Sequence, residues 1–392
     1  MLALFLLLVL VGCAPRHRLV LYETAPVETG LDHADLPEAY EVWLDAVNHA
    51  RTGIDLEFFY ASDAPGSRLG PVIEALEAAA GRGVVVRFIA DRKFHDTYPQ
   101  VLDRLDAVDG ITVRLLDLEQ RTGGVVHAKT IIVDGRTVLV GSHNFDWRSL
   151  EHIQELGVIV EHPDVVDVFE HIFTADWILA GGGESITPRD EPDGAFDVRF
   201  QGERCTVRPV ASPTGLLPDP DTWDLPALVE LIDGAQRRIR VQLLSYSTRQ
   251  WGGGEFVTLD RALRRAAARG VQVELLLSHW STRRSQVGTL QELQRVANFS
   301  IKLATIPEHS SGFIPYARVI HSKYMTVDGE DAWIGTGNWG GDYFHKSRNL
   351  GLIVHGPAFA RRLDGIFEDL WESPYAEPLD PDRAYPEPRI GQ

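Results

Sequence analysis

The sequence predicts an α/β fold, built as two tandem repeats that pack into a two-lobed monomer about a pseudo-two-fold axis. Three observations support this prediction: an internal duplication, strands that alternate with helices, and an ordinary globular composition. The 392 residues suit two domains of typical size. With 44% hydrophobic and 24% charged residues, the composition excludes a disordered chain, a collagen-like fibre and a coiled coil.

The internal duplication is the most informative feature of the chain. His127-Ala128-Lys129 recurs 194 residues later as His321-Ser322-Lys323. The same displacement relates residues 141–144 to 335–338 and residues 155–160 to 349–354. Three ordered matches at one spacing exclude chance similarity of short motifs, so the chain contains two related folding units.

Secondary structure follows from hydrophobic periodicity and turn residues. In each half an apolar strand precedes an Ala-rich helix, and a second strand and a hairpin follow. The hairpins turn at Asp134-Gly135 and Asp328-Gly329, a dipeptide that favours tight β-turns. The expected segments are strands 54–60, 84–90, 239–246 and 271–277, helices within 75–84 and 262–271, and hairpin strands 130–133 and 137–141 with their second-half equivalents.

Domain boundaries follow from composition. Residues 2–11 are an unbroken apolar run, too short to span a bilayer, that ends in Gly12-Cys13 and resembles a bacterial lipobox. We therefore expect a lipoprotein signal peptide at 1–12, lipidation of Cys13 and an exported, membrane-anchored protein of the cell envelope; the alternative is a buried N-terminal helix or strand. The first repeat is expected at 13–180, a Gly- and Pro-rich linker at 181–197 and the second repeat at 198–392.

The net charge limits where an anion can bind. The chain has 38 Lys and Arg against 56 Asp and Glu, a formal charge of −18. This balance argues against broad non-specific binding to nucleic acid or anionic lipid. A phosphate site must therefore be local.

Each repeat contains HxKxxxxD and, after six intervening residues, G[ST]xN. Residues two apart on a strand share a face, so His127 projects with Lys129, and His321 with Lys323. Two His–Lys pairs would form a cationic pocket suited to the charge that builds up on a phosphodiester in its transition state. The histidines could then divide nucleophilic attack and proton donation. Asp134 and Asp328 stand in predicted turns, so we expect them to shape the hairpins.

The duplicated pattern resembles the phospholipase D superfamily. Residues 141–158, 314–325 and 334–344 are similar to the branch of animal phospholipase D family members 3 and 4, lysosomal 5′ exonucleases on single-stranded nucleic acid, and poxviral envelope phospholipases. The resemblance implies a metal- and cofactor-independent reaction through a phosphohistidine. His127 would be the nucleophile and His321 the general acid. The implied phosphate ligands are Lys129, Lys323, Asn144 and Asn338, with the hydroxyls of Ser142 and Thr336.

The resemblance also gives Glu155 a role. It stands where a carboxylate would orient the nucleophilic imidazole, here that of His127, whereas the second repeat has Asn349. A carboxylate behind one imidazole makes that ring the better nucleophile.

The sequence leaves the substrate open. A 5′ exonuclease, a phospholipase D or phosphatidyltransferase, and a non-catalytic binding protein are all considered; the intact His–Lys pairs disfavour the third. A single set of candidate side chains could stack on the bases of a nucleic acid, or it could form an apolar surface for the acyl chains of a lipid. We expect a monomer, because the duplication supplies both half-sites. The candidate side chains are Phe145, Trp147, Trp280, Tyr316, Arg318, Trp339, Tyr343 and Phe344.

Overall fold

The computed structural model describes residues 17–184, 194–250 and 253–391. The predicted signal peptide and Cys13 lie outside the described residues, as does the middle of the predicted linker. Among the helices that are described, none is long and apolar enough to cross a membrane.

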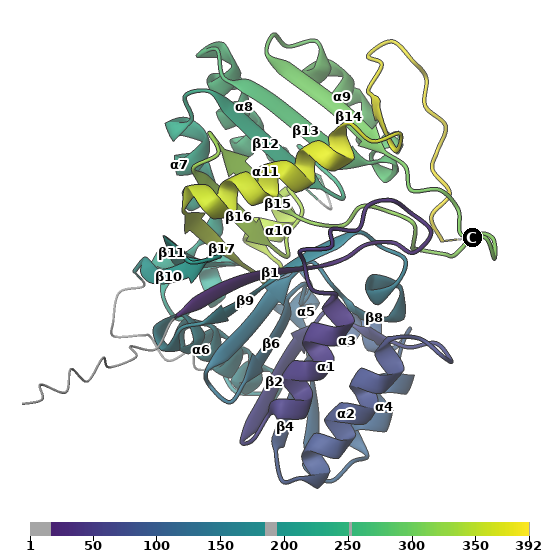
Figure 1. Ribbon diagram of the computed structural model, residues 1–392, viewed down its shortest axis with the longest axis vertical. Helices are drawn as coiled ribbons and strands as arrows, with labels where there is room; N and C mark the ends of the chain where they lie inside the picture. Colours follow the sequence, from purple (N-terminus) through teal and green to yellow (C-terminus); the bar gives the residue numbers. More distant parts are fainter. Residues whose placement is uncertain (1–16, 185–193, 251–252, 392) are drawn as a thin grey trace, which may run out of the picture.

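The elements alternate as the sequence predicts (Figure 1). The first part of the chain contains β1 Arg18–Thr24, α1 Ala39–His49, β2 Gly53–Phe58, β3 Ala61–Ser62, α2 Leu69–Gly81, β4 Val85–Asp91, α3 Arg92–His95, α4 Gln100–Asp106, β5 Ile111–Leu116, α5 Leu118–Thr122, β6 Lys129–Val133, β7 Thr137–Gly141, β8 Phe145–Asp146, β9 Glu155–Glu161 and α6 Pro163–Ala180. The second part contains β10 Phe196–Phe200, β11 Glu203–Ser212, α7 Asp224–Gly234, β12 Arg238–Leu243, α8 Thr258–Ala268, β13 Gln272–Ser278, α9 Val287–Gln294, β14 Phe299–Ala304, β15 Tyr324–Val327, β16 Asp331–Gly335, α10 Gly341–His345, β17 Asn349–His355, α11 Pro357–Trp371 and β18 Ala376–Pro378.

Both repeats contribute to a single sheet. In the described chain it has 16 strands, in the order β18-β14-β13-β12-β15-β16-β17-β11-β10-β1-β9-β7-β6-β2-β4-β5. The run from β5 to β9 repeats the run from β14 to β17, which confirms the predicted α/β duplication. β1 pairs with β9 and with β10, so the N-terminal strand lies where the repeats meet (Figure 1).

Helices cover both faces of the sheet. Helices α6 and α11 pack on one face in a single core that includes residues of both repeats. On the other face α1, α2 and α4 cover the first repeat, and α7, α8 and α9 cover the second. Because one core crosses the boundary, the repeats are held together by apolar burial as well as by strand pairing.

In both hairpins the motif aspartate stands in the turn and contacts neighbouring backbone. Asp134 and Gly135 both have positive φ, 55° and 61°, and Asp328 and Gly329 have 56° and 67°. Such turns match the twist of the flanking strands. The Asp134 carboxylate also accepts backbone N–H groups of residues 51–53, at 2.7–3.1 Å, and Asp328 accepts those of residues 236–238, each at 2.8 Å.

Two strands end earlier than the sequence predicts. β2 ends at Phe58 rather than at residue 60, and β12 ends at Leu243 rather than at residue 246. The aromatic residues Phe59 and Tyr60 continue the apolar pattern, but their side chains are only half-buried. They leave the sheet at the end where β2 and β4 both terminate, an edge where α/β folds commonly place ligands.

Candidate active site

The two motif histidines lie where the repeats cross. His127 donates its backbone N–H to Arg348 at 2.9 Å, and His321 donates its own to Gln154 at 2.8 Å. Isolated parallel bridges join the residues just before each histidine to Arg348 and Gln154. The two bridges are equivalent, because adding 194 to the residue numbers 126 and 154 gives 320 and 348. Each repeat therefore makes the same contact with the other, around a pseudo-two-fold axis.

The side-chain partners of the histidines also cross between repeats. His321 Nδ1 lies 2.9 and 2.8 Å from the two carboxylate oxygens of Glu155, and His127 Nδ1 lies 3.0 Å from Oδ1 of Asn349. The expectation that Glu155 orients His127 is therefore wrong. The bridges place the first residue of β9 beside the second repeat's histidine, and the first residue of β17 beside the first repeat's.

The amide of Asn349 has a defined orientation. Its Nδ2 donates to the backbone oxygens of Tyr343 and Ser347, at 2.8 and 3.3 Å. Its Oδ1 accepts the Thr336 hydroxyl at 3.1 Å and faces His127. A carbonyl oxygen in this position requires an N–H on Nδ1 of His127, and the Glu155 carboxylate requires the same of His321. Both rings therefore offer Nε2 to a substrate.

Two buried lysines supply the positive charge. Lys129 donates to the backbone oxygen of His127 at 2.7 Å, and Lys323 donates to that of His321. Burial lowers the pKa of both ammonium groups, that of Lys323 to about 7, and Lys323 lowers the pKa of Lys129 further. A bound phosphodiester would restore the charged form, because an anion stabilises a buried cation.

The imidazoles are neutral in this environment. Burial and the charges of Lys129 and Lys323 hold the pKa of His127 and of His321 well below the usual value. A charge on His321 also lowers the pKa of His127, so the rings are near enough to interact electrostatically. A neutral imidazole with a free Nε2 can attack phosphorus or accept a proton.

The remaining expected phosphate ligands divide into two groups. Asn144 is buried and, among the described residues, its Oδ1 has no hydrogen-bond partner; Asn338 accepts the backbone N–H of Ser245 and donates to the Tyr343 hydroxyl. The hydroxyls of Ser142 and Thr336 instead bond across the strands. The Ser142 hydroxyl bonds to the backbone of residue 156, and the Thr336 hydroxyl bonds to residues 349 and 350. We therefore assign both hydroxyls to strand pairing rather than to phosphate binding.

Two further side chains lie beside His127: Asp91, which was not identified as a site residue from the sequence, and Tyr343, which was one of the predicted aromatic candidates. Buried Asp91, the last residue of β4, accepts the N–H of Val126 at 2.7 Å and so fixes the backbone just before the histidine. The ring of Tyr343 stands edge-on to His127, with centroids 5.1 Å apart. A carboxylate directly after a buried strand was the available signal for Asp91.

Three of the seven predicted aromatic candidates belong to the core. Phe145, Trp339 and Phe344 are at most 2% exposed and pack in the main hydrophobic clusters. The guanidinium of Arg318 donates to the backbone oxygens of residues 307 and 27. These four side chains are therefore structural.

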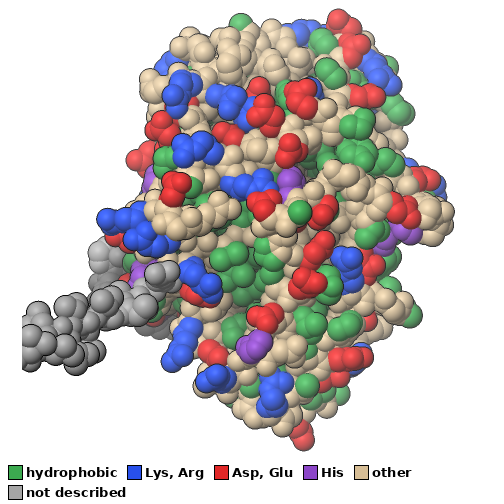
Figure 2. Space-filling model, viewed as in Figure 1, with side chains coloured by type: hydrophobic (Ala, Val, Ile, Leu, Met, Phe, Trp, Pro, Cys, Tyr) green, Lys and Arg blue, Asp and Glu red, His purple; other side chains and the backbone are tan. Residues whose placement is uncertain are grey.

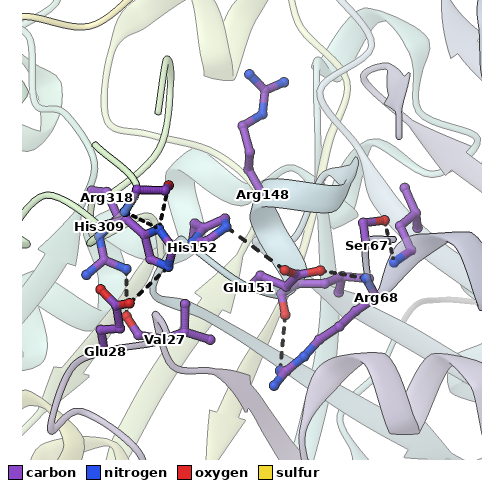
Figure 3. A network of polar contacts seen from close by, with 12 residues as sticks. Val27, Glu28, Ser67, Arg68, Arg148, Glu151, His152, His309 and Arg318 are labelled. Atoms are coloured by element: carbon purple, nitrogen blue, oxygen red, sulfur yellow. Dashed lines mark hydrogen bonds and ion pairs between the residues drawn. The ribbon is translucent and has the colours of Figure 1, made fainter. Parts of the chain in front are cut away.

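A second polar network joins the N-terminal segment to both repeats (Figure 3). His152 of the first repeat packs edge-on to His309 of the second, with ring centroids 4.9 Å apart, and Arg318 donates its backbone N–H to His152. His309 in turn pairs with Glu28 at 3.2 Å. Burial and the charges of His309 and Arg318 lower the pKa of His152 to about 4.

Two repeats that each place a buried His–Lys pair in one shared site define a protein of the phospholipase D class. A family model described as "Cardiolipin synthase, PLD-like domain" matches residues 43–177 and 228–371. The chain belongs to the phospholipase D superfamily of phosphodiesterases, as the sequence motifs predict.

Similar proteins carry two kinds of name. The chain is 32% identical to the rat (Rattus norvegicus) protein named 5′-3′ exonuclease PLD3, over 88% of this chain and 76% of that protein. It is 30% identical to phospholipase D Z of Dictyostelium discoideum, over 87% and 86%. A phosphatidylserine synthase structure from Haemophilus influenzae shares the fold, with a TM-score of 0.64, 10% identity and coverage of 87% and 85%.

Proposed function

We propose that the protein hydrolyses single-stranded nucleic acid from its 5′ end through a covalent phosphohistidine. The main support is the pair of imidazoles whose Nδ1 atoms face Asn349 and Glu155, each beside a buried lysine of its own motif. The similarity to the exonuclease PLD3 supports the choice of substrate. We further propose a metal-independent reaction, a monomer and attachment to the cell envelope through lipidated Cys13.

The observed partners support roles for the two histidines that are opposite to those implied by the sequence. A carboxylate stabilises the positive charge that a histidine acquires when it attacks phosphorus, and Glu155 lies behind His321. An imidazolium backed by a neutral amide releases its proton more readily, and Asn349 lies behind His127. In the proposal His321 is therefore the nucleophile and His127 the general acid.

The reaction then proceeds in two displacements. The negative charge of the bound phosphodiester favours the imidazolium form of His127, which takes up a proton from solvent. Nε2 of His321 then attacks phosphorus, the bond to the ester oxygen breaks, and the protonated His127 gives its proton to that leaving oxygen. Water next attacks phosphorus, His127 accepts one proton from it, and the P–N bond to His321 breaks. Lys129 and Lys323 stabilise the charge on the non-bridging oxygens in both steps.

A phospholipase D activity is the second candidate. Leu244, Trp280 and Ile314 are partly buried and pack on a small apolar cluster that includes Ile153, close in sequence to the site residue Glu155. Such a surface would suit an acyl chain. The similarity to phospholipase D Z also favours a phospholipase D activity.

One pair of assays separates the candidates. The purified protein is incubated in EDTA with a 5′-hydroxyl single-stranded oligonucleotide and, separately, with phosphatidylcholine vesicles. The proposal predicts stepwise loss of 5′ nucleotides and little choline release. Choline release without nucleotide release would establish the second candidate, and activity lost on chelation would contradict a metal-free reaction.

A further inference from the structure

Four aromatic side chains extend from His127 on the first-repeat side of the site. The Phe59 ring lies 5.3 Å from the imidazole and 4.0 Å from the ring of Phe94. Tyr60 stacks on Phe94 at 6.2 Å and on Tyr98 at 5.0 Å, with interplanar angles of 27° and 26°. All four are only partly buried, although phenylalanine is among the residues most often fully buried.

The outer two rings are held at their polar ends. Burial and the charge of Asp146 raise the pKa of the Tyr60 hydroxyl, and the Tyr98 hydroxyl contributes to the raised pKa of Arg148, so both tyrosines face this acidic and basic pair. Asp146 and Arg148 form a buried ion pair, with the shortest N–O distance 2.5 Å. Tyr60 and Tyr98 therefore form a fixed backing for Phe59 and Phe94, and the phenylalanine rings are preorganised beside the imidazole.

The second repeat builds the equivalent position without aromatic rings. The pairing of β2 with β4 matches that of β12 with β13, which makes Leu244 the counterpart of Phe59 and Ser281 the counterpart of Phe94. The Ser281 hydroxyl donates to the Leu244 backbone oxygen at 3.3 Å, and Ser281 is fully buried. The fold therefore does not require rings here, and the phenylalanine pair breaks the symmetry on the His127 side.

Positive charge accompanies the phenylalanine pair. Lys129 Nζ lies 5.5 Å from the centroid of Phe59. Aromatic faces next to cations are the combination that binds single-stranded nucleic acid, with bases stacked on rings and phosphates near cations.

We propose that Phe59 and Phe94 form a base-stacking wall for a nucleotide attached to the phosphate at His127 and His321. This inference rests on the proposed nuclease function and adds to it that the strand lies on the first-repeat side of the site. Because stacking uses the π-face that every base has, the wall binds bases without strong sequence preference.

The test compares two single strands of equal length, a 5′-hydroxyl oligothymidylate and the same backbone with abasic tetrahydrofuran residues. The wild type should show a KM for oligothymidylate about tenfold below that for the abasic strand, as expected for one base–aromatic contact. Phe94→Leu should abolish this preference by raising the oligothymidylate KM, with kcat unchanged. Phe94→Tyr, which keeps an aromatic face, should retain the preference and shows that the position tolerates substitution.

The matched control is Trp280→Leu, which removes an aromatic ring from the second repeat and should leave the preference intact. The inference is overturned if Phe94→Leu retains the wild-type preference, or if Trp280→Leu abolishes it instead. Failure of the proposed function looks different, because the wild type would then cleave neither strand.

Discussion

The carboxylate of Glu155 in the first repeat lies 2.8 Å from Nδ1 of His321 in the second. The reciprocal contact, from Asn349 to His127, uses an amide instead. Each histidine is thus oriented by the other repeat, so neither repeat contains a complete site. The chemical difference between the two partners breaks the symmetry of the duplication and sets the proposed order of the reaction.

Replacing Glu155 by Gln should impair nucleophilic attack. We expect kcat to fall by about 10²–10⁴-fold, the range seen when a histidine loses its orienting carboxylate. The matched variant is Asn349→Ala, which removes the amide oxygen that orients His127, the proposed general acid. With a p-nitrophenyl phosphodiester, whose leaving group needs no proton, Asn349→Ala should approach wild-type kcat while Glu155→Gln stays slow. Recovery of Glu155→Gln on this substrate would reverse the proposed roles.

The pH dependence of kcat/KM should report Lys323. Its pKa of about 7 means that the ammonium is charged below pH 7 in the free enzyme and becomes neutral as pH rises above it. Since the charged form binds phosphate, kcat/KM should fall by up to about tenfold per pH unit above the break. Lys323→Met should lower kcat/KM at pH 6 and remove the break near 7. A wild-type profile that is flat from pH 6 to 9 contradicts this role.

Asp134→Asn should cost stability and not catalysis. The replacement tolerates positive φ but removes a charged acceptor of three backbone N–H groups, so we expect a loss of about 1–3 kcal/mol in the free energy of unfolding. Urea denaturation measures this loss, and Asp328→Asn should give a similar one. A large fall in kcat with unchanged urea midpoint would show that the aspartate acts in the reaction.

Stability should decrease as pH falls from 6.5 towards 4. The pKa of His143 and that of His152 are both lowered to about 4 by burial, so in this window the unfolded chain binds protons that the folded chain excludes. We expect a loss of roughly 3 kcal/mol per histidine by pH 4. His152→Gln should flatten the dependence of the thermal midpoint on pH. An unchanged slope would mean that His152 protonates freely in the native network of Figure 3.

Local sequence signals predicted the duplicated fold well. Strand periodicity, the Asp-Gly turns and the ordered repeats all reflect interactions within a few residues or a fixed displacement. Strand ends were less accurate, since Phe59 continues an apolar pattern although the chain has left the sheet. Figure 2 shows acidic and basic side chains intermingled over the face that it displays, in agreement with a local anion site.

The partners of the histidines could not be obtained from such signals. Sequence position places Glu155 in the same repeat as His127, and only the crossing bridges at Arg348 and Gln154 reveal that it serves His321. The position of Asp91 after an apolar strand marks it for the edge of the sheet, but its contact with the backbone N–H of Val126 is visible only in the structure. Phe59 and Phe94 were not predicted as site residues. From the sequence alone, an aromatic residue that is half-buried cannot be distinguished from one that is buried in the core.

The site of phosphorylation tests the central claim most directly. The protein is mixed briefly with a p-nitrophenyl phosphodiester, quenched in alkali, where phosphohistidine is stable, digested and mapped by mass spectrometry. The adduct should lie on His321 in the wild type, accumulate there in His127→Ala and be missing from His321→Ala. An adduct on His127 in the wild type would contradict the assignment, and turnover without any histidine adduct would contradict the covalent mechanism.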